Sequence, residues 1–232
     1  MAEALEVVSG ALKQRLQSSK LPGYIAIEGP IGIGKTTLSR RLAETFGYQT
    51  LLEPVADNPF LRDFYQHRGR NALATQLYFL LSRARQVSDI RQQDLIGTQL
   101  ISDFLLDKDD LFARMTLSAQ EYGLYQQIHA SLDLAAPQPD LVVYLQAPAP
   151  KLLERVRTRG IDFEQHIDAG YLETLIDAYT EFFHFYDAAP LLIVNASEMD
   201  LSHNPAHFEA LVERMLAMDS AREYFNPNPT LL

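Results

Sequence analysis

The sequence of 232 residues contains no cysteine, so the chain can form neither a disulfide framework nor a thiolate metal site. No apolar run approaches the ~20 residues that a membrane-spanning helix requires. The first twenty residues also lack the basic start and apolar core of a secretory signal. These absences favour a soluble, cytoplasmic protein that does not associate with membranes.

Positive charge is scarce, because 20 Lys and Arg stand against 30 Asp and Glu, a formal net charge of −10. Affinity for DNA or RNA depends on neutralising phosphates, so we expect no nucleic-acid partner. A local cluster of cations could still bind an anionic nucleotide.

No internal repeat, low-complexity tract or Gly/Ser linker divides the chain. We expect one domain over 23–219, preceded by a lead-in segment over 1–22 and followed by an irregular tail over 220–232. Leu5, Val8, Leu12 and Leu16 recur at helical spacing, which predicts an amphipathic helix over 3–18.

Short, unbroken apolar runs alternate with longer helical patterns. The predicted strands are 24–28, 48–53, 98–103, 140–146 and 190–195. The predicted helices are roughly 36–46, 71–96, 105–135, 149–158, 169–187 and 206–218. Unbroken apolar strands are typical of a parallel sheet that is buried on both faces. The alternation therefore predicts an α/β fold with three layers, in which helices flank a five-stranded parallel sheet.

The strongest local signal is a segment that fits G-x-x-x-x-G-K-[ST] between a predicted strand and a predicted helix. It consists of Gly29, Pro30, Ile31, Gly32, Ile33, Gly34, Lys35 and Thr36, with Thr37 next. Glycines let successive backbone N–H groups point at phosphate oxygens, and the following helix adds the positive end of its dipole. Lys35 is suited to the β- and γ-phosphates of ATP and the Thr36 hydroxyl to Mg²⁺.

A phosphate-binding loop alone does not name a reaction. The sequence has no N-K-x-D segment, which a GTPase would use to read guanine. Its single D-x-x-G match, at residues 94–97, precedes a predicted strand where it should follow one, so we interpret it as a helix end. A small kinase is the interpretation that remains.

Several separated motifs then follow the loop in a recognisable order. They are LLEPVADNPF (51–60), QLYFLLSRAR (76–85), LISDFLLDKDDLFA (100–113) and ERVRTRGIDFEQ (154–165). With the loop, they resemble the deoxynucleoside kinase family, most closely its bacterial members that phosphorylate purine deoxynucleosides. The resemblance covers about residues 24–195. It implies a five-stranded parallel sheet with a short lid, an ATP-dependent transfer of phosphate to a deoxynucleoside, and a homodimer.

Glu53 ends the second predicted strand, at the edge where open α/β sheets bind ligands. A carboxylate there could orient an acceptor hydroxyl and take its proton, and the resembling family has its general base at this Glu-Pro. Gln76 offers a donor and an acceptor side by side for reading a base. The resemblance adds Arg83 and an acidic partner from the DKDD segment, for which we predict Asp107.

Tyr65 and Glu164 match the pair that holds the sugar 3′-hydroxyl in the resembling family. The lid, over about 155–168, carries a cluster of arginines. On a helix, Arg155 and Arg159 share a face, so we predict that both stabilise the transferring phosphate. Arg157 points elsewhere and is expected to be structural or exposed.

Asp103 ends a predicted strand and could reach Mg²⁺ directly or through water. Animal and insect members of the family carry Glu-Arg-Ser at this point, so one positive group near the phosphates is missing. His203 and His207 are spaced i, i+4, but Pro205 lies between them and no third ligand is evident, so we expect no zinc site.

Two other functions stay open at this stage. A nucleotide kinase would need arginines for the phosphate of its acceptor, and Arg62, Arg68 and Arg70 could supply them. A non-catalytic nucleotide sensor or regulatory subunit could share the fold. The presence of Lys35 and Glu53 argues against the loss of an active site.

Overall fold

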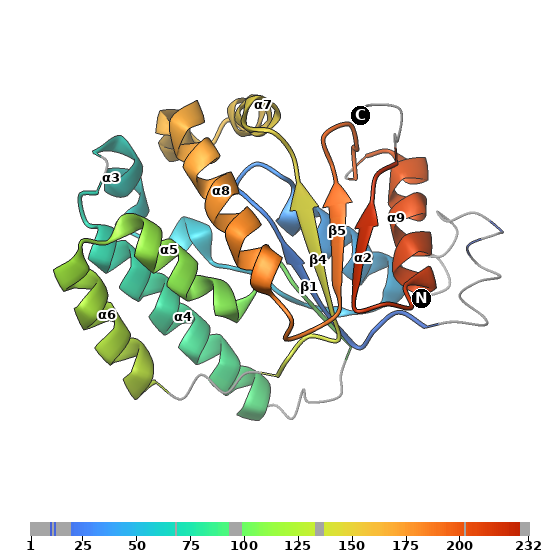
Figure 1. Ribbon diagram of the computed structural model, residues 1–232, viewed down its shortest axis with the longest axis horizontal. Helices are drawn as coiled ribbons and strands as arrows, with labels where there is room; N and C mark the ends of the chain where they lie inside the picture. The colour runs from blue at the N-terminus through green and yellow to red at the C-terminus, as the bar shows by residue number, and fades with distance from the viewer. Residues whose placement is uncertain are drawn as a thin grey trace.

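The computed structural model describes residues 10, 12, 20–67, 69–92, 99–132, 137–201 and 203–227. Within these residues, six strands form one sheet in which every pair of neighbours is parallel, in the order β2-β3-β1-β4-β5-β6 (Figure 1). The strands are β1 Tyr24–Glu28, β2 Gln49–Leu51, β3 Leu100–Ser102, β4 Leu141–Gln146, β5 Leu191–Asn195 and β6 Arg222–Phe225.

Eight helices with six or more residues are described. They are α2 Lys35–Phe46, α3 Leu61–Gln66, α4 Ala72–Gln92, α5 Asp109–Thr116, α6 Ala119–Ser131, α7 Ala149–Arg159, α8 Ala169–Phe185 and α9 Pro205–Ala217. Short 3₁₀ turns lie at η2 Val55–Asp57, η3 Leu106–Lys108 and η4 Asp162–His166. Figure 1 shows α3, α4, α5 and α6 gathered on one side of the molecule and α9 on the other.

The sheet has a hydrophobic cluster on each face, which makes the three layers. On one face, alternate residues of β1, β4 and β5 pack against α2, α7 and α9. On the other face, the intervening residues pack against α5 and α8, with Tyr144, Tyr179 and Phe183 at its centre. The predicted α/β class, with a parallel sheet between helices, is confirmed, because strands buried on both faces have apolar residues at consecutive positions.

The number of strands was wrong, since five were predicted and six are present. β6 lies in the segment that we expected to be irregular, and it pairs in parallel with β5 from Leu191↔Arg222 to Val194↔Phe225. Its four residues, REYF, include two charged ones and only one that is buried. An edge strand of this kind lacks the apolar run by which the other five strands were recognised.

The single helix predicted over 105–135 was also wrong, because η3, α5 and α6 occupy this segment, whose residues 133–136 lie outside those described. The chain turns at Ser118, whose hydroxyl accepts a hydrogen bond from the Glu121 backbone N–H while the Glu121 carboxylate accepts from the Ser118 N–H. This capping box is visible in the sequence as Ser-x-x-Glu and could have located the break.

Parts of other predicted helices fall outside the described residues. Of the predicted lead-in helix, only Gly10 and Leu12 are described; both are helical, and Leu12 is fully buried in the core. The helix predicted over 71–96 is described as α4, to Gln92. None of the helices described is long and apolar enough to cross a membrane.

Candidate active site

The phosphate-binding loop joins β1 to α2 and has a backbone that only glycine adopts easily. Gly29, Gly32 and Gly34 have φ angles of 144°, 83° and 100°. A Cβ on Gly29 would lie 2.5 Å from the Leu145 carbonyl oxygen of β4, so the loop also depends on close approach of two backbones. Lys35 Nζ donates to the Gly29 carbonyl at 2.7 Å. The loop thus presents a helix N-terminus and a lysine, as phosphate binding requires.

Asp103 connects the phosphate-binding loop to the segment that follows β2. Its Oδ2 accepts from the Thr36 hydroxyl at 2.5 Å, and its Oδ1 accepts from the Glu53 backbone N–H at 2.7 Å. Burial raises the pKa of the Asp103 carboxyl. The structure therefore brings together Thr36 and Asp103, the two residues predicted to approach Mg²⁺.

The donors at this point, a hydroxyl and a carboxylate, are oxygen ligands of the kind that Mg²⁺ prefers. The described part of the chain contains no group of three or more His, Cys, Asp or Glu that could hold a metal. Thr36 and Asp103 therefore fit a Mg²⁺ ion that takes its other ligands from nucleotide phosphates and water, as is usual for kinases.

Glu53 lies two residues beyond β2, where it is largely buried among cations. Its Oε1 accepts from Arg83, and its Oε2 is 3.9 Å from Lys108 Nζ. Burial alone would raise the pKa of Glu53, but Lys108, Arg83 and Lys35 outweigh burial and lower this pKa to about 2. Glu53 is thus an ionised carboxylate next to the phosphate-binding lysine.

Arg83 on α4 is buried between two carboxylates, those of Glu53 and Asp109. The predicted acidic partner, Asp107, was the wrong member of the DKDD segment. Asp107 lies in η3, is exposed, and is close enough to Tyr24 and Tyr186 to raise their pKa values. The 3₁₀ turn sets the phase of this segment, so that Asp109, the first residue of α5, faces Arg83.

Gln76 lies on α4 and is buried, as Arg83 is. Its side-chain nitrogen donates to the Thr116 hydroxyl at 3.2 Å, at the end of α5. A cavity of about 170 Å³ opens beside Thr116. Its lining residues are Phe64, Tyr65, Gly69, Met115, Thr116, His166, Ile167 and Tyr171. Helices α3, α5 and α8 and the lid turn η4 therefore enclose a pocket that has both aromatic and polar walls.

Tyr65, which lines this pocket, lies close to Glu164, with which it was predicted to work as a pair. Tyr65 stacks on Phe163 at a centroid distance of 6.4 Å. Its pKa is raised well above the ordinary value, mainly by burial and to a smaller extent by the nearby Tyr171 and Glu164. Glu164 is buried in η4 and accepts a hydrogen bond from Arg159. Glu53 also contributes to the raised pKa of Tyr65, so the sugar-binding candidates lie near the candidate base.

Arg155 and Arg159 share a face of α7 but contact different partners. Arg155 donates to three backbone oxygens in the segment after β5, those of Ala196, Ser197 and Met199, at 2.9, 3.5 and 3.2 Å. Arg159 pairs with Glu164. Arg157 is exposed, as expected. Equal spacing on a helix therefore did not give the two arginines equal surroundings.

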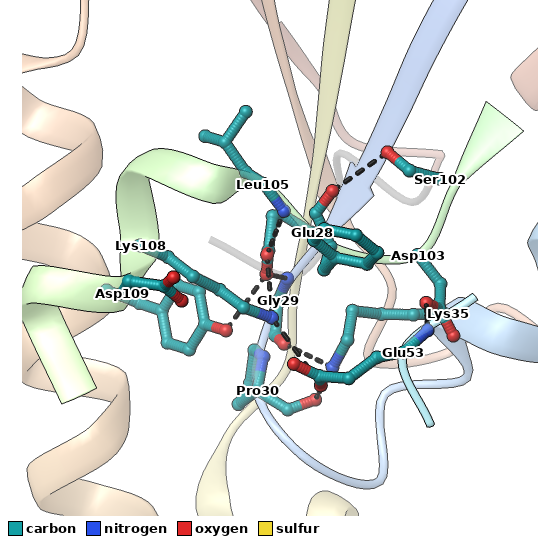
Figure 2. Close-up of polar contacts among 12 residues, drawn as sticks. Glu28, Gly29, Pro30, Lys35, Glu53, Ser102, Asp103, Leu105, Lys108 and Asp109 are labelled. Atoms are coloured by element: carbon teal, nitrogen blue, oxygen red, sulfur yellow. Dashed lines mark hydrogen bonds and ion pairs between the residues drawn. The ribbon is translucent and has the colours of Figure 1, made fainter. Parts of the chain in front are cut away.

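Sequence reasoning missed two buried charges, those of Glu28 and Lys108. Glu28 is the last residue of β1, and its Oε1 lies 2.9 Å from Lys108 Nζ (Figure 2). In the sequence, Glu28 looks like an ordinary strand end and Lys108 like one charge in an acidic segment. A carboxylate that ends a fully apolar strand directly before a phosphate-binding loop was the available signal.

Comparisons with known proteins agree with this geometry. A model of the deoxynucleoside kinase family matches residues 25–218. The chain is 36% identical over 193 residues to a deoxyguanosine kinase of Bacillus subtilis, covering 81% of this chain and 93% of that protein. It is 33% identical over 199 residues to a deoxyadenosine kinase of Dictyostelium discoideum, covering 83% and 80%.

Among solved structures, the chain is similar to deoxyadenosine kinase from M. mycoides. The form with dCMP and dCDP bound gives a TM-score of 0.72 at 27% identity, covering 84% of this chain and all of that one. The form with dATP bound gives a TM-score of 0.71 at 28% identity, covering 83% and 98%.

Proposed function

Because the chain belongs to the deoxynucleoside kinase family, we propose that it transfers the γ-phosphate of ATP to the 5′-hydroxyl of a deoxynucleoside. The observation that carries this proposal is the position of Glu53. The ionised Glu53 carboxylate is close both to Lys35 of the phosphate-binding loop and to Tyr65, which lines the pocket beside Thr116. Such a group is needed when the acceptor is an alcohol, whose proton must leave as the phosphate arrives.

In the proposed reaction, the 5′-oxygen forms a bond to the γ-phosphorus while the bond from that phosphorus to the β,γ-bridging oxygen breaks. ADP leaves with the electron pair of the broken bond, and the hydroxyl proton passes to the Glu53 carboxylate. Enzymatic phosphoryl transfer relies chiefly on positioning and electrostatic stabilisation, so a carboxylate of low basicity is adequate. Mg²⁺, held through Thr36 and Asp103, would neutralise phosphate charge.

We propose that the acceptor is a purine deoxynucleoside. Gln76 and Arg83 are proposed to read the base, and Tyr65 and Glu164 to hold the 3′-hydroxyl. The relatives named above are deoxyguanosine and deoxyadenosine kinases, which favours these two acceptors. The assignment of Arg155 and Arg159 to the transferring phosphate stays a prediction, as does a cytoplasmic location.

The alternative of a nucleotide kinase is less well supported by the geometry. Arg62, which could have bound an acceptor phosphate, pairs with Asp162, and Arg70 lies 3.8 Å from Asp63. Arg68 is outside the described residues. A regulatory subunit without activity would not need an ionised Glu53 beside Lys35.

A panel of acceptors tests the proposal. Purified protein with Mg²⁺ and ATP is incubated with deoxynucleosides, ribonucleosides and nucleoside monophosphates, and ADP release is followed. We expect turnover of deoxyguanosine or deoxyadenosine, with deoxycytidine and ribonucleosides slower. Turnover of monophosphates alone would establish the nucleotide kinase, and ATP binding without turnover on any acceptor would establish the regulatory subunit.

We also propose a homodimer that uses α4 and α6. Each of these helices exposes a large hydrophobic side chain, Leu81 at 43% and Leu124 at 46%. Analytical ultracentrifugation should give twice the chain mass, and Leu81→Glu should shift the population toward the monomer. A wild-type monomer at micromolar concentration would contradict the proposal.

A further inference from the structure

Lys108 is a lysine with almost no access to solvent, at 2% exposure, and it lies in the middle of the candidate site. It ends η3, and its Nζ lies 2.9 Å from Glu28 Oε1 and 3.9 Å from Glu53 Oε2 (Figure 2). Lysine is rarely buried unless it is paired, because removing its charge from water costs several kcal/mol. The position of Lys108 therefore depends on the carboxylates that surround it.

Glu28 is held in place by four donors from different elements. Its Oε2 accepts from the Gly29 N–H at 2.8 Å and from the Tyr179 hydroxyl of α8 at 2.9 Å. Its Oε1 accepts from the Leu105 N–H at 2.7 Å and pairs with Lys108. A carboxylate with every oxygen engaged cannot easily rotate, so the fold itself fixes the point at which the ammonium lies.

Glu53 lies between two such pairs of opposite charges. On one side, Arg83 is shared between Glu53 and the buried Asp109. On the other side, Lys108 is shared between Glu53 and the buried Glu28. Each cation therefore has its own carboxylate and also attracts one oxygen of Glu53.

We propose that the Glu28–Lys108 pair is a positioning device, which holds the Glu53 carboxylate in place for the acceptor hydroxyl. The proposal rests on the function given above, in which Glu53 receives the hydroxyl proton. Lys108 acts through Glu53 and is therefore a positioning residue. Glu28 in turn positions Lys108 and, through its bond with the Gly29 N–H, ties the same pair to the start of the phosphate-binding loop.

The charges that face Glu53 show how much of its state depends on Lys108. The groups concerned are Lys108 of η3, Arg83 of α4, Lys35 of α2, Asp103 after β3, Tyr65 of α3 and Tyr179 of α8. Burial raises the pKa of Glu53, and Lys108 has the largest opposing influence; together with Arg83 and Lys35 it lowers this pKa to about 2. Lys108 also adds to the effect of burial in lowering the pKa of Lys35.

The test is whether the Glu53 carboxylate stays ordered when the pair is removed, measured directly at one pH. Lys108→Met alone would leave Glu28 as an unpaired buried charge and could unfold the chain. The double variant Glu28→Gln/Lys108→Met removes both charges and keeps similar volumes. At pH 7, the Glu53 carboxyl-carbon NMR signal, assigned by its loss in Glu53→Gln, should be a single sharp line in wild type and should broaden in the double variant. The kcat for the deoxynucleoside should fall by about 10-fold or more, while the Kd for ATP stays within about threefold of wild type.

Two further variants separate positioning from folding. Lys108→Arg keeps the positive charge and should leave the Glu53 signal a single sharp line. Lys151→Met removes a lysine of the exposed Lys151–Glu198 pair and should change neither the Glu53 signal nor kcat.

A folded double variant whose Glu53 signal stays as sharp as that of wild type would overturn the inference. The NMR measurement needs no turnover, so it remains decisive for the Glu28–Lys108 pair even if wild type phosphorylates no deoxynucleoside. That second result would refute the proposed function instead.

Discussion

The two halves of the sheet end differently at their carboxyl edge. β1 ends at Glu28, and Glu53 and Asp103 follow β2 and β3, so three carboxylates gather on one half. On the other half, β4 and β5 end at Gln146 and Asn195, which are uncharged amides. Within the described residues, the carboxyl edge of the first half has a buried network of ionised groups, whereas β4 and β5 of the second half end in amides.

The energetic cost of burying charged groups therefore falls on the half of the sheet that carries the candidate active site. Burying a charge costs several kcal/mol per ion unless the charge is paired and hydrogen-bonded. Even a paired buried charge rarely stabilises the fold more than hydrophobic side chains of equal volume would. The amide half shows the less costly solution: Asn195 accepts from the Ser197 hydroxyl at 2.6 Å, and Tyr144 stacks on Phe183 at 4.2 Å. Charges on the first half are therefore explained by phosphate transfer better than by folding.

The largest effect should come from removing the carboxylate at the centre of the charged half. Glu53→Gln is expected to lower kcat by about 10²–10⁴-fold, the usual contribution of a positioned general base. ATP affinity, measured by isothermal titration calorimetry, should stay within about threefold, because the phosphate-binding loop is unchanged. A kcat within about threefold of wild type would show that Glu53 is not the base.

Acid should destabilise the half of the sheet that carries Glu28, Glu53 and Asp103 before the half that ends in Gln146 and Asn195. The pKa of Glu53 is lowered to about 2 in the folded state, below its ordinary value of 4.5. The folded state thus binds this proton less readily than the unfolded state. The stabilisation, up to about 3 kcal/mol, is complete above about pH 4.5 and is lost as the pH falls toward 2.

Urea unfolding between pH 6 and pH 3 measures this loss. The free energy of unfolding should fall more steeply with decreasing pH in wild type than in Glu53→Gln, which lacks the titrating group. Parallel curves for the two proteins would show that the cations do not hold Glu53 ionised.

The two lid arginines should separate activity from stability. Arg159 pairs with Glu164 beside the pocket, so Arg159→Met should lower kcat by about 10²-fold if it also stabilises the transferring phosphate. Arg155→Met should lower the free energy of unfolding by about 1–3 kcal/mol, because three carbonyl oxygens lose their donor. Thermal unfolding and steady-state kinetics on both variants provide the comparison. The reverse pattern would mean that Arg155 contacts the phosphate.

The smallest effect is expected on the amide half. Glu198→Gln makes the same chemical change as Glu53→Gln, but Glu198 is half exposed and pairs with Lys151 at 3.5 Å on the surface. Exposed pairs contribute roughly 0–1 kcal/mol, so kcat should stay within about twofold and stability should hardly change. A large loss of kcat would show that the charge requirement extends across the whole edge.

Much of the fold followed from local pattern. Four buried strands, β1, β3, β4 and β5, were evident because each is apolar at consecutive positions, and the loop from Gly29 to Thr36 has an unusual composition with a known physical purpose. β6 was missed because an edge strand needs only one neighbour and can be polar. The break at Ser118 was missed although its capping box was present.

The position of Glu53 at the carboxyl edge of the sheet could be predicted, because it depends only on where one strand ends. It was not predictable where two distant segments meet. Glu28 and Lys108 are far apart in sequence, and their pairing follows only from the order β3-β1 in the sheet and the turn of η3. Likewise, the choice of Asp109 over Asp107 depends on the phase of a 3₁₀ turn, which composition does not reveal.

The position of the transferred phosphate tests the account most directly. Wild-type protein is incubated with Mg²⁺, ATP and deoxyguanosine or deoxyadenosine, and the products are identified by ³¹P NMR. The account predicts equal amounts of ADP and a deoxynucleoside 5′-monophosphate. Inorganic phosphate in place of the monophosphate, or a phosphorylated product formed only from added monophosphates, would contradict it.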